Sequence, residues 1–304
     1  MTVLVVGTVA LDSVETPFGK AEEVIGGSAV FFAASASHLT RVQVVGVVGH
    51  DYPFARLDPL VQRGVDFAGV EKVSGASFRW HGRYGHDLNS AETLDTRLGV
   101  LATFKPRIPD NFRNAPFVFL GNVDPRIQLD VLNQIARPRI VACDTMNFWI
   151  EGSRPELLDV LKKVDILTIN EGEARQLSQK ANLLKAAAWL LEQGPRTVVI
   201  KKGEHGALLF TGKSIFFAPA FPLEDVFDPT GAGDSFAGGF LGAIARSGDT
   251  SDASFRRAVI YGSAMGSFAV ERFSIDGLLN INAADISKRI KHFHDLVSFD
   301  WESM

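Results

Sequence analysis

The chain has 304 residues, of which 46% are hydrophobic and 22% are charged, a composition typical of a globular protein with enough apolar material for a large core. The formal net charge is −4 and acidic and basic residues are interspersed, so neither nucleic acid nor an anionic membrane is indicated as a partner. The single cysteine, Cys143, excludes an intrachain disulfide framework.

The first predicted element is a strand at residues 3–6, followed closely by Asp12. The sequence around this strand lacks the basic start and apolar segment of a signal peptide, and no apolar run approaches the length of a membrane span. We therefore expect a cytoplasmic protein. A carboxylate just past a first strand can accept hydrogen bonds from two adjacent hydroxyl groups of a ligand. A solvated loop aspartate is an equally good interpretation of Asp12.

Gly26, Gly27 and Ser28 precede the first predicted helix, at residues 28–39. Paired glycines allow the backbone to approach a ligand closely, and Ser28 is predicted to cap the helix. Taken alone, these residues fit a tight loop with a helix cap equally well.

Apolar, β-branched runs then alternate with helical patterns, which indicates a parallel sheet wrapped by helices. The predicted strands are residues 3–6, 42–48, 117–120, 140–143, 166–169 and 197–200. The predicted helices are residues 28–39, 55–63, 127–135, 156–164, 183–192, 234–246, 253–269 and 283–296.

One stretch interrupts this alternation. Residues 77–83 (SFRWHGR) alternate bulky apolar and polar side chains, as in a strand with one face covered. Because the stretch falls between two α/β units, we expect it to belong to a small separate sheet, to which residues 12–24 would add a hairpin. Trp80 in this sheet can stack on a flat ligand, and Arg83 can bind an anionic substituent; packing between strands explains both side chains equally well.

Polar residues follow several of the strands. Residues 170–173 (NEGE) come directly after one strand, and on their own read as a helix start with acids in its first turn. Residues 201–206 (KKGEHG) come after another and contain a Gly-x-x-Gly turn. Since ligands of open α/β sheets bind at the carboxyl ends of the strands, these residues are candidates for one site.

The most informative stretch is residues 228–236 (DPTGAGDSF), which opens an apolar helix rich in small residues. A glycine-rich turn at a helix start directs several backbone N–H groups at one point, where an anion such as phosphate binds. Asp234 beside that point can accept the proton of an attacking hydroxyl. The combination indicates phosphoryl transfer to an alcohol.

This run resembles the second signature of the ribokinase (PfkB) family of carbohydrate kinases. Other stretches from Gly7 to about Phe273 match in the family's order, so the resemblance covers nearly the whole chain. It implies an α/β fold, a ribokinase-like three-layer sandwich with a mostly parallel central sheet. The chain would form a single domain over residues 1–304, with a small β lid contributed by about residues 12–25 and 72–100.

The resemblance also implies roles for the candidate residues. Asp234 would be the catalytic base, and the amides of Gly231, Ala232 and Gly233 would hold the transferring phosphoryl group. Gly26, Gly27 and Ser28 match the family's first signature, which lies with Asp12 on the acceptor; Trp80 and Arg83 of the lid would cover the acceptor.

On the donor side, Asn170 and Glu173 match the family's Asn-x-x-Glu motif, which organises water and Mg²⁺ around the phosphates. Gly203 and Gly206 match the nucleotide-side loop. Lys201, where the family usually has a small or apolar residue, is a candidate partner of the donor phosphates. Asp228 and Thr230 are candidates for a monovalent cation site, K⁺ in some members, although residues 270–274 (VERFS) lack the glycine frequent in potassium-dependent members.

We therefore expect an ATP- and Mg²⁺-dependent kinase that phosphorylates a hydroxyl of a small polyol. A sugar is the favoured acceptor. A homodimer that forms through the lid is a candidate assembly. A nucleoside kinase of the same family is the alternative, because Phe31 stands where furanose-binding members often carry Asn, and Phe31, Phe32 and Trp80 would suit a base. A non-catalytic sugar sensor would not need Asp234. A dehydrogenase is excluded, because residues 7–12 (GTVALD) do not supply Gly-x-Gly-x-x-Gly.

Overall fold

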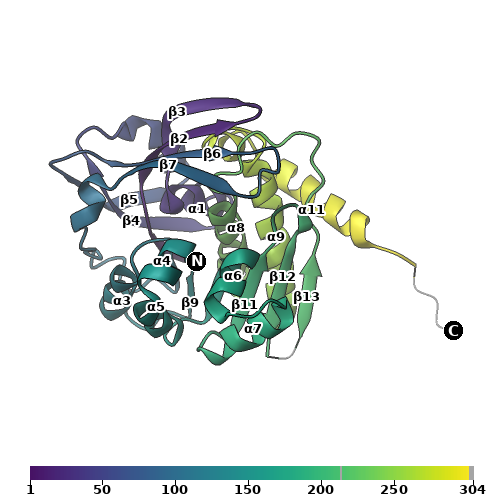
Figure 1. The fold of residues 1–304 in the computed structure, drawn as a ribbon. Coiled ribbons are helices and arrows are strands. Elements are labelled where there is room, and N and C mark those ends of the chain that lie inside the picture. The colour runs from purple at the N-terminus through teal and green to yellow at the C-terminus, as the bar shows by residue number, and fades with distance from the viewer. Residues whose placement is uncertain (213, 301–304) are drawn as a thin grey trace.

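The computed structural model describes residues 1–212 and 214–300, which fold around a nine-stranded sheet (Figure 1). In spatial order its strands are β13 (Ile215–Ala218), β12 (Ala207–Thr211), β11 (Thr197–Lys201), β10 (Ile166–Asn170), β9 (Ile140–Cys143), β8 (Phe117–Leu120), β1 (Thr2–Val6), β4 (Arg41–Gly49) and β5 (Val65–Val73). All neighbours from β11 to β5 are parallel, whereas β12 and β13 add antiparallel pairs at one edge.

Helices cover both faces of this sheet, because the central strands are apolar on both sides. Val3 and Val5 of β1 belong to one buried cluster, and Leu4 and Val6 to another on the opposite face. The first face is covered by α1 (Ser28–Ala36), α2 (Asp58–Gln62), α8 (Ala232–Ser247), α9 (Asp252–Ala269), α10 (Asp276–Leu279) and α11 (Ala283–Val297). The second is covered by α3 (Pro125–Gln134), α4 (Asn147–Gly152), α5 (Arg154–Leu161), α6 (Glu171–Ser178) and α7 (Leu183–Glu192). The architecture is the α/β sandwich that the sequence predicted.

A second, four-stranded sheet lies along one side of the molecule (Figure 1). Its strands, in spatial order, are β3 (Gly19–Gly26), β2 (Ala10–Thr16), β6 (Phe78–Tyr84) and β7 (Ala91–Arg97). It contains the stretch that interrupts the α/β pattern of the sequence. Residues 72 and 73, which the sequence analysis placed in the lid, belong instead to β5 of the central sheet. We call this four-stranded sheet the lid sheet.

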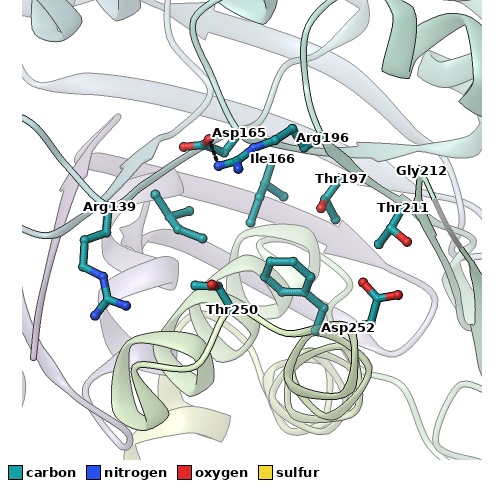
Figure 2. A pocket seen from close by; sticks show the side chains of 11 residues that line it. Arg139, Asp165, Ile166, Arg196, Thr197, Thr211, Gly212, Thr250 and Asp252 are labelled. Atoms are coloured by element: carbon teal, nitrogen blue, oxygen red, sulfur yellow. Dashed lines mark hydrogen bonds and ion pairs between the residues drawn. The ribbon is translucent and has the colours of Figure 1, made fainter.

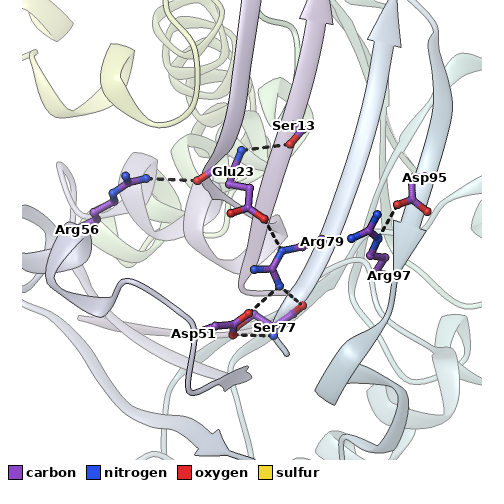
Figure 3. A network of polar contacts seen from close by, with 8 residues as sticks. All are labelled: Ser13, Glu23, Asp51, Arg56, Ser77, Arg79, Asp95 and Arg97. Atoms are coloured by element: carbon purple, nitrogen blue, oxygen red, sulfur yellow. Dashed lines mark hydrogen bonds and ion pairs between the residues drawn. The ribbon is translucent and has the colours of Figure 1, made fainter. Parts of the chain in front are cut away.

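Polar contacts anchor the lid sheet where β6 begins (Figure 3). The Arg79 guanidinium forms ion pairs with Glu23, 2.7 Å away on β3, and with Asp51, 2.8 Å away in the loop after β4. Asp51 also accepts hydrogen bonds from the amide and hydroxyl of Ser77. The base of the lid sheet is thereby tied to the loop that follows a central strand.

No helix of the described residues has the length and apolar character that crossing a bilayer requires.

Candidate active site

The carboxyl ends of three parallel strands bring together polar residues that are far apart in sequence. Asp144 follows β9 directly, Asn170 is the last residue of β10, and Lys201 is the last residue of β11. The register pairs Asn170 with Lys201. The start of α8 faces this edge, because a Cβ added to Gly233 would lie 2.8 Å from Lys201 Nζ.

The turn before α8 has the form of an anion-binding loop. Gly231 adopts φ 72° and ψ 3°, a left-handed conformation that favours glycine, and a Cβ there would overlap the Phe31 ring. Among the described residues, no hydrogen-bond partner is found for the Gly231 and Gly233 amides. The Ala232 amide donates to the Pro229 carbonyl at 3.2 Å, so it is engaged in the turn, whereas the sequence had assigned all three amides to phosphate.

Asp228 holds this loop in place from behind. Its two carboxylate oxygens accept hydrogen bonds from the Thr230 amide, at 2.8 Å, and from the Ser274 amide, at 3.3 Å. Burial raises the pKa of Asp228, and these hydrogen bonds oppose the rise. The contacts connect the loop to the segment after α9, near which a monovalent cation was predicted. That cation site stays a prediction.

Asp234 lies in the first turn of α8 beside Lys201. Burial raises the pKa of Asp234 to about 7, the carboxylate of Asp144 adds to the rise, and the ammonium of Lys201 opposes it. A carboxylate with this pKa can take up a proton near neutral pH, as a general base must.

Asp12 is a second buried carboxylate, only 5% exposed. One of its oxygens accepts from the Gly27 amide at 3.3 Å, and a Cβ on Gly26 would overlap the same carboxylate. Burial raises the pKa of Asp12 to about 7, and Asp228 and Asp234 contribute to the rise. The glycine pair and Asp12 therefore lie in contact, as the sequence predicted. Asp12 is also close enough to Asp234, the candidate base, for the charge of Asp234 to raise the pKa of Asp12.

Ser28 does not cap α1, in contrast to the expectation from its position. The N-cap is Gly27, and no side chain caps the helix. The Ser28 hydroxyl accepts from the Thr8 amide at 3.0 Å, while the Ser28 amide donates to the Thr8 hydroxyl at 2.8 Å. This reciprocal pair fixes the start of α1 against the loop after β1, so Ser28 supports the glycine pair rather than presenting a free hydroxyl.

Asn170 and Glu173 form a reciprocal capping box at the start of α6. The Asn170 side chain accepts from the Glu173 amide at 2.8 Å, and one Glu173 carboxylate oxygen accepts from the Asn170 amide at 3.0 Å. The other Glu173 oxygen has no hydrogen-bond partner among the described residues. Burial and the Asp144 carboxylate raise the pKa of Glu173, and Lys201 opposes the rise.

This arrangement fits a magnesium ion held through water. A carboxylate oxygen is the hard ligand that Mg²⁺ prefers, and Mg²⁺ keeps several of its own waters. Within residues 1–212 and 214–300, no three His, Cys, Asp or Glu side chains are grouped so that they could hold a metal directly. Glu173 is therefore a candidate for contact with metal-bound water only.

The nucleotide-side loop is in contact with the lid sheet. Gly203 has φ 55°, and a Cβ there would lie 2.5 Å from the Asn89 side-chain oxygen, in the turn between β6 and β7. Gly206 has φ 86° and lies against the backbone of Ala218, so the close approach of β13 explains why glycine is needed there. The role of both glycines in nucleotide binding stays a prediction.

The lid sheet presents different residues on its two faces. Asp12 pairs with Trp80 in the parallel register of β2 and β6, so both side chains lie on one face. Tyr84 lies on the same face by alternation, and its hydroxyl is 3.4 Å from the Thr230 hydroxyl. Arg83 lies on the opposite face, where its guanidinium pairs with Glu15 at 3.0 Å. The structure thus brings Trp80 toward the site and does not bring Arg83 there.

A cavity of about 310 Å³ lies elsewhere, at the amino ends of the central strands (Figure 2). It is lined by Arg139, Arg196 and Asp165 among others, and Arg196 already pairs with Asp165. None of the predicted site residues lines it.

Comparison with known proteins agrees with this geometry. The model of the pfkB family of carbohydrate kinases matches residues 8–278. The chain belongs to the PfkB family. One curated relative is a cytidine kinase of Thermococcus kodakarensis, which is 30% identical over 81% of this chain and 89% of the relative. Another is an ATP-dependent ribose-1-phosphate kinase of Halopiger xanaduensis, which is 29% identical over 81% of this chain and 80% of the relative.

Solved structures share the fold. A nucleoside kinase of Methanocaldococcus jannaschii superposes with a TM-score of 0.76 at 21% identity, covering 96% of this chain and 98% of that one. A ribokinase-type protein of E. coli, in complex with ATP and Mg²⁺, gives a TM-score of 0.78 at 19% identity over 96% and 99%. This PfkB-family chain is a phosphotransferase that acts on an alcohol group of a sugar or nucleoside-type substrate.

Two residues of the site lay outside the set assigned from sequence. Asp144 directly follows the apolar strand β9, so its place at a strand end was a signal that could have found it. Tyr84 directly follows the predicted lid strand at residues 77–83, but its contact with Thr230 depends on how the two sheets are placed. The alternation of β6 could have grouped Tyr84 with Trp80 and separated both from Arg83.

Proposed function

We propose that this PfkB-family enzyme phosphorylates a hydroxyl group of a nucleoside, with ATP and Mg²⁺ as the donor. The choice of a nucleoside depends on one observation, the similarity to a cytidine kinase over more than four-fifths of both chains. It replaces the sugar that the sequence favoured with the nucleoside that was its alternative.

Phe31 and Phe32 are buried in the core, Phe31 against Gly231 and Phe32 stacked on Phe119, so neither ring is available to a base as the sequence suggested. Two other residues on the acceptor side are consistent with a nucleoside. Trp80 adds aromatic surface on the face of the lid sheet that carries Asp12, and aromatic rings stack well on bases. Asp12 would accept hydrogen bonds from the ribose hydroxyls.

The chemistry follows from the start of α8. Asp234 would accept the proton of the attacked hydroxyl while the oxygen–phosphorus bond forms. The Gly231 and Gly233 amides would donate to the transferring phosphoryl group, whose charge needs donors already in place. Glu173 would hold a water of Mg²⁺, and the ion supplies positive charge that neutralises the donor phosphates.

A panel assay of ADP release tests the proposal. The purified enzyme is incubated with MgATP and, separately, with cytidine, uridine, adenosine, ribose, fructose and ribose 1-phosphate. Release of ADP with at least one nucleoside, well above the rate with any sugar or sugar phosphate, is the expected result. Turnover confined to a sugar or a sugar phosphate would overturn the assignment of a nucleoside.

A further inference from the structure

A buried ion pair between Lys201 and Asp144 lies beside the anion loop. The sequence made Lys201 a general candidate for the donor phosphates, but it gave neither the phosphate concerned nor any role for Asp144. The Lys201 Nζ is 3.0 Å from Asp144 Oδ2, and the two side chains are only 16% and 7% exposed. Burying a charge pair is costly unless its geometry is well fixed, so a pair at this position calls for an explanation.

Asp144 is held rigidly at the end of β9. Its other carboxylate oxygen accepts from the Thr145 amide at 2.8 Å, and its backbone amide donates to the Leu120 carbonyl at 3.0 Å. The buried Gln128 side chain donates to the Asp144 carbonyl at 3.1 Å and to the Gly121 carbonyl at 2.9 Å. The carboxylate therefore offers Lys201 a fixed partner.

The ammonium group of Lys201 is held at the point where a phosphoryl group would bind. It lies directly over Gly233, whose amide has no hydrogen-bond partner in the described part of the chain, and beside Asp234. Burial alone would lower the pKa of Lys201, but the carboxylates of Asp144, Glu173 and Asp234 outweigh it and raise the pKa. The group stays charged throughout the neutral range.

We propose that Lys201 binds the phosphoryl group that is transferred from ATP, and that Asp144 positions its ammonium group for this contact. The proposal rests on the proposed use of ATP and is independent of which alcohol is the acceptor. In the step itself, the bond from the acceptor oxygen to phosphorus forms while the phosphorus–oxygen bond to ADP breaks, and that electron pair stays on ADP. The hydroxyl proton passes to Asp234, whereas Lys201 keeps its protons and supplies charge and hydrogen bonds.

Binding of MgATP compared with MgADP tests the contact directly, because only ATP carries the group concerned. A hydrogen bond to a charged group is worth about 1.5–3 kcal/mol, so Lys201→Met should weaken MgATP roughly ten- to hundredfold. MgADP should change less than about threefold, and Lys201→Arg should retain most of the preference for ATP. Lys202→Met is the matched control, since no partner of that neighbouring side chain is found in the described part of the chain.

Lys201→Met leaves the Asp144 charge buried and unpaired, which can itself unfold the protein. The double variant Lys201→Met/Asp144→Asn removes both charges and should lose the same preference for ATP. Equal weakening of ATP and ADP, or an equal loss in Lys202→Met, would overturn the proposal. If wild type binds no MgATP, both this proposal and the use of ATP are wrong; if it binds MgATP but the variants keep the preference, only this proposal is wrong.

The pH dependence of turnover separates positioning from a purely structural role. The charged and titratable groups around Asp234 are Asp144, Lys201, Glu173, Asp12 and Tyr84. Asp144 raises the pKa of Asp234 and Lys201 lowers it, so Asp144→Asn should move the acid limb of kcat to lower pH and Lys201→Met should move it to higher pH. Shifts in the same direction, or none, would contradict the placement of the pair.

Discussion

Among single residues, the proposed phosphoryl transfer depends most on Asp234. Asp234→Asn should lower kcat by about 10²–10⁴, because general-base assistance is typically worth that much, while MgATP still binds. Steady-state kinetics together with a binding titration would show the split between the two. A variant that keeps most of the wild-type kcat would remove Asp234 from the mechanism.

The dependence of kcat/KM on pH gives a second test of Asp234 as the base. The base must be unprotonated to act, and burial raises the pKa of Asp234 to about 7, so kcat/KM should fall as the pH drops below about 7. The free energy of unfolding should change in the opposite direction, rising as the pH drops. Because the folded-state pKa is above the unfolded value of 3.8, the charged carboxylate destabilises the fold above about pH 7, and this cost fades as the pH falls. Asp234→Asn should therefore raise Tm more at pH 8 than at pH 5.

Glu173→Gln should raise the Mg²⁺ concentration needed for half-maximal rate, with little effect on the KM of the acceptor. Glutamine can keep the capping-box bond to the Asn170 amide but loses the charge offered to metal-bound water. Glu171→Gln is the matched control, since Glu171 lies in the same helical turn and pairs with Arg175. Equal effects of the two substitutions would return Glu173 to the role of a helix cap.

Sequence reasoning succeeded for residues whose position is set by local structure. Asp12 lies in β2, the glycine pair lies where β3 ends and α1 begins, and Gly231–Asp234 opens α8. The Gly27 amide donates to Asp12, and the charge of Asp234 contributes to the pKa of Asp12, so these residues meet in the structure. Alternation along the lid strand places Trp80 and Arg83 on opposite faces, but the sequence gives no register between β2 and β6 and so does not show which face lies on the site. That register puts Trp80 beside Asp12 and Arg83 beside Glu15.

At the scale of elements, the lid sheet lies in contact with both sides of the site. Its hairpin tip packs the Phe18 ring edge-on against Phe227, just before the anion loop, with centroids 6.1 Å apart. The Tyr84 hydroxyl reaches Thr230, and Asn89 reaches Glu204 in the nucleotide-side loop. We therefore expect the lid sheet to release these contacts when ATP enters and to exclude water when it closes.

Hydrogen exchange over β6 and β7 should slow when MgATP and the acceptor are both bound. The expected change is concentrated in residues 78–97 and is absent from the core strands β1 and β8. Exchange in the lid sheet that does not respond to ligand would leave it as a static edge of the fold. The acceptor would then be sought at the start of α4, near Asn147, Phe148 and Trp149, which follow Asp144 at the same edge of the central sheet.

Arg79→Met should loosen the lid sheet, because it removes the ion pairs to Glu23 and Asp51 that tie its base to the loop after β4 (Figure 3). We expect faster exchange in β6 without ligand and more ATP hydrolysis in the absence of acceptor. Arg97→Met is the matched control, since Arg97 pairs with Asp95 of the same exposed strand. If both variants behave alike, the ion pairs at the base do not hold the lid sheet.

Elements with a strong apolar period were predictable, and polar or short ones were not. The helix at 183–192 was placed with its observed bounds, and most central strands within a residue or two. β7 falls within residues 72–100, which were expected to contribute to the lid, but it was not predicted as a strand because its side chains are nearly all polar and exposed, as on an edge strand. α4 was missed because its six residues are too few to show a helical period.

At the scale of the whole molecule, the site is assembled from both ends of the chain. Phe31 from the first helix packs on Gly231, and the Ser35 hydroxyl donates to the Ser235 carbonyl at 2.6 Å. Ligands that span these segments should stabilise the entire fold. A ligand at one hundred times its Kd adds about 2.7 kcal/mol, so MgATP and a nucleoside together should raise Tm by several degrees. A nucleoside that is turned over but leaves Tm unchanged would contradict this arrangement.

A homodimer through the lid sheet stays a prediction. The edge strand β7 carries Glu92, Asp95 and Arg97, and charged side chains of this kind disfavour pairing of edge strands between copies. A dimer would therefore use a face of the lid sheet rather than its β7 edge. Sedimentation of the wild type would determine the oligomeric state.

The most direct test of the account is mass spectrometry of the reaction of MgATP with cytidine, wild type against Asp234→Asn. We expect wild type to form a nucleoside monophosphate in step with ADP, and the folded variant to bind ATP but to form almost none. ADP without a phosphorylated nucleoside, from cytidine or any other nucleoside of the panel, would contradict it, as would equal product from the variant.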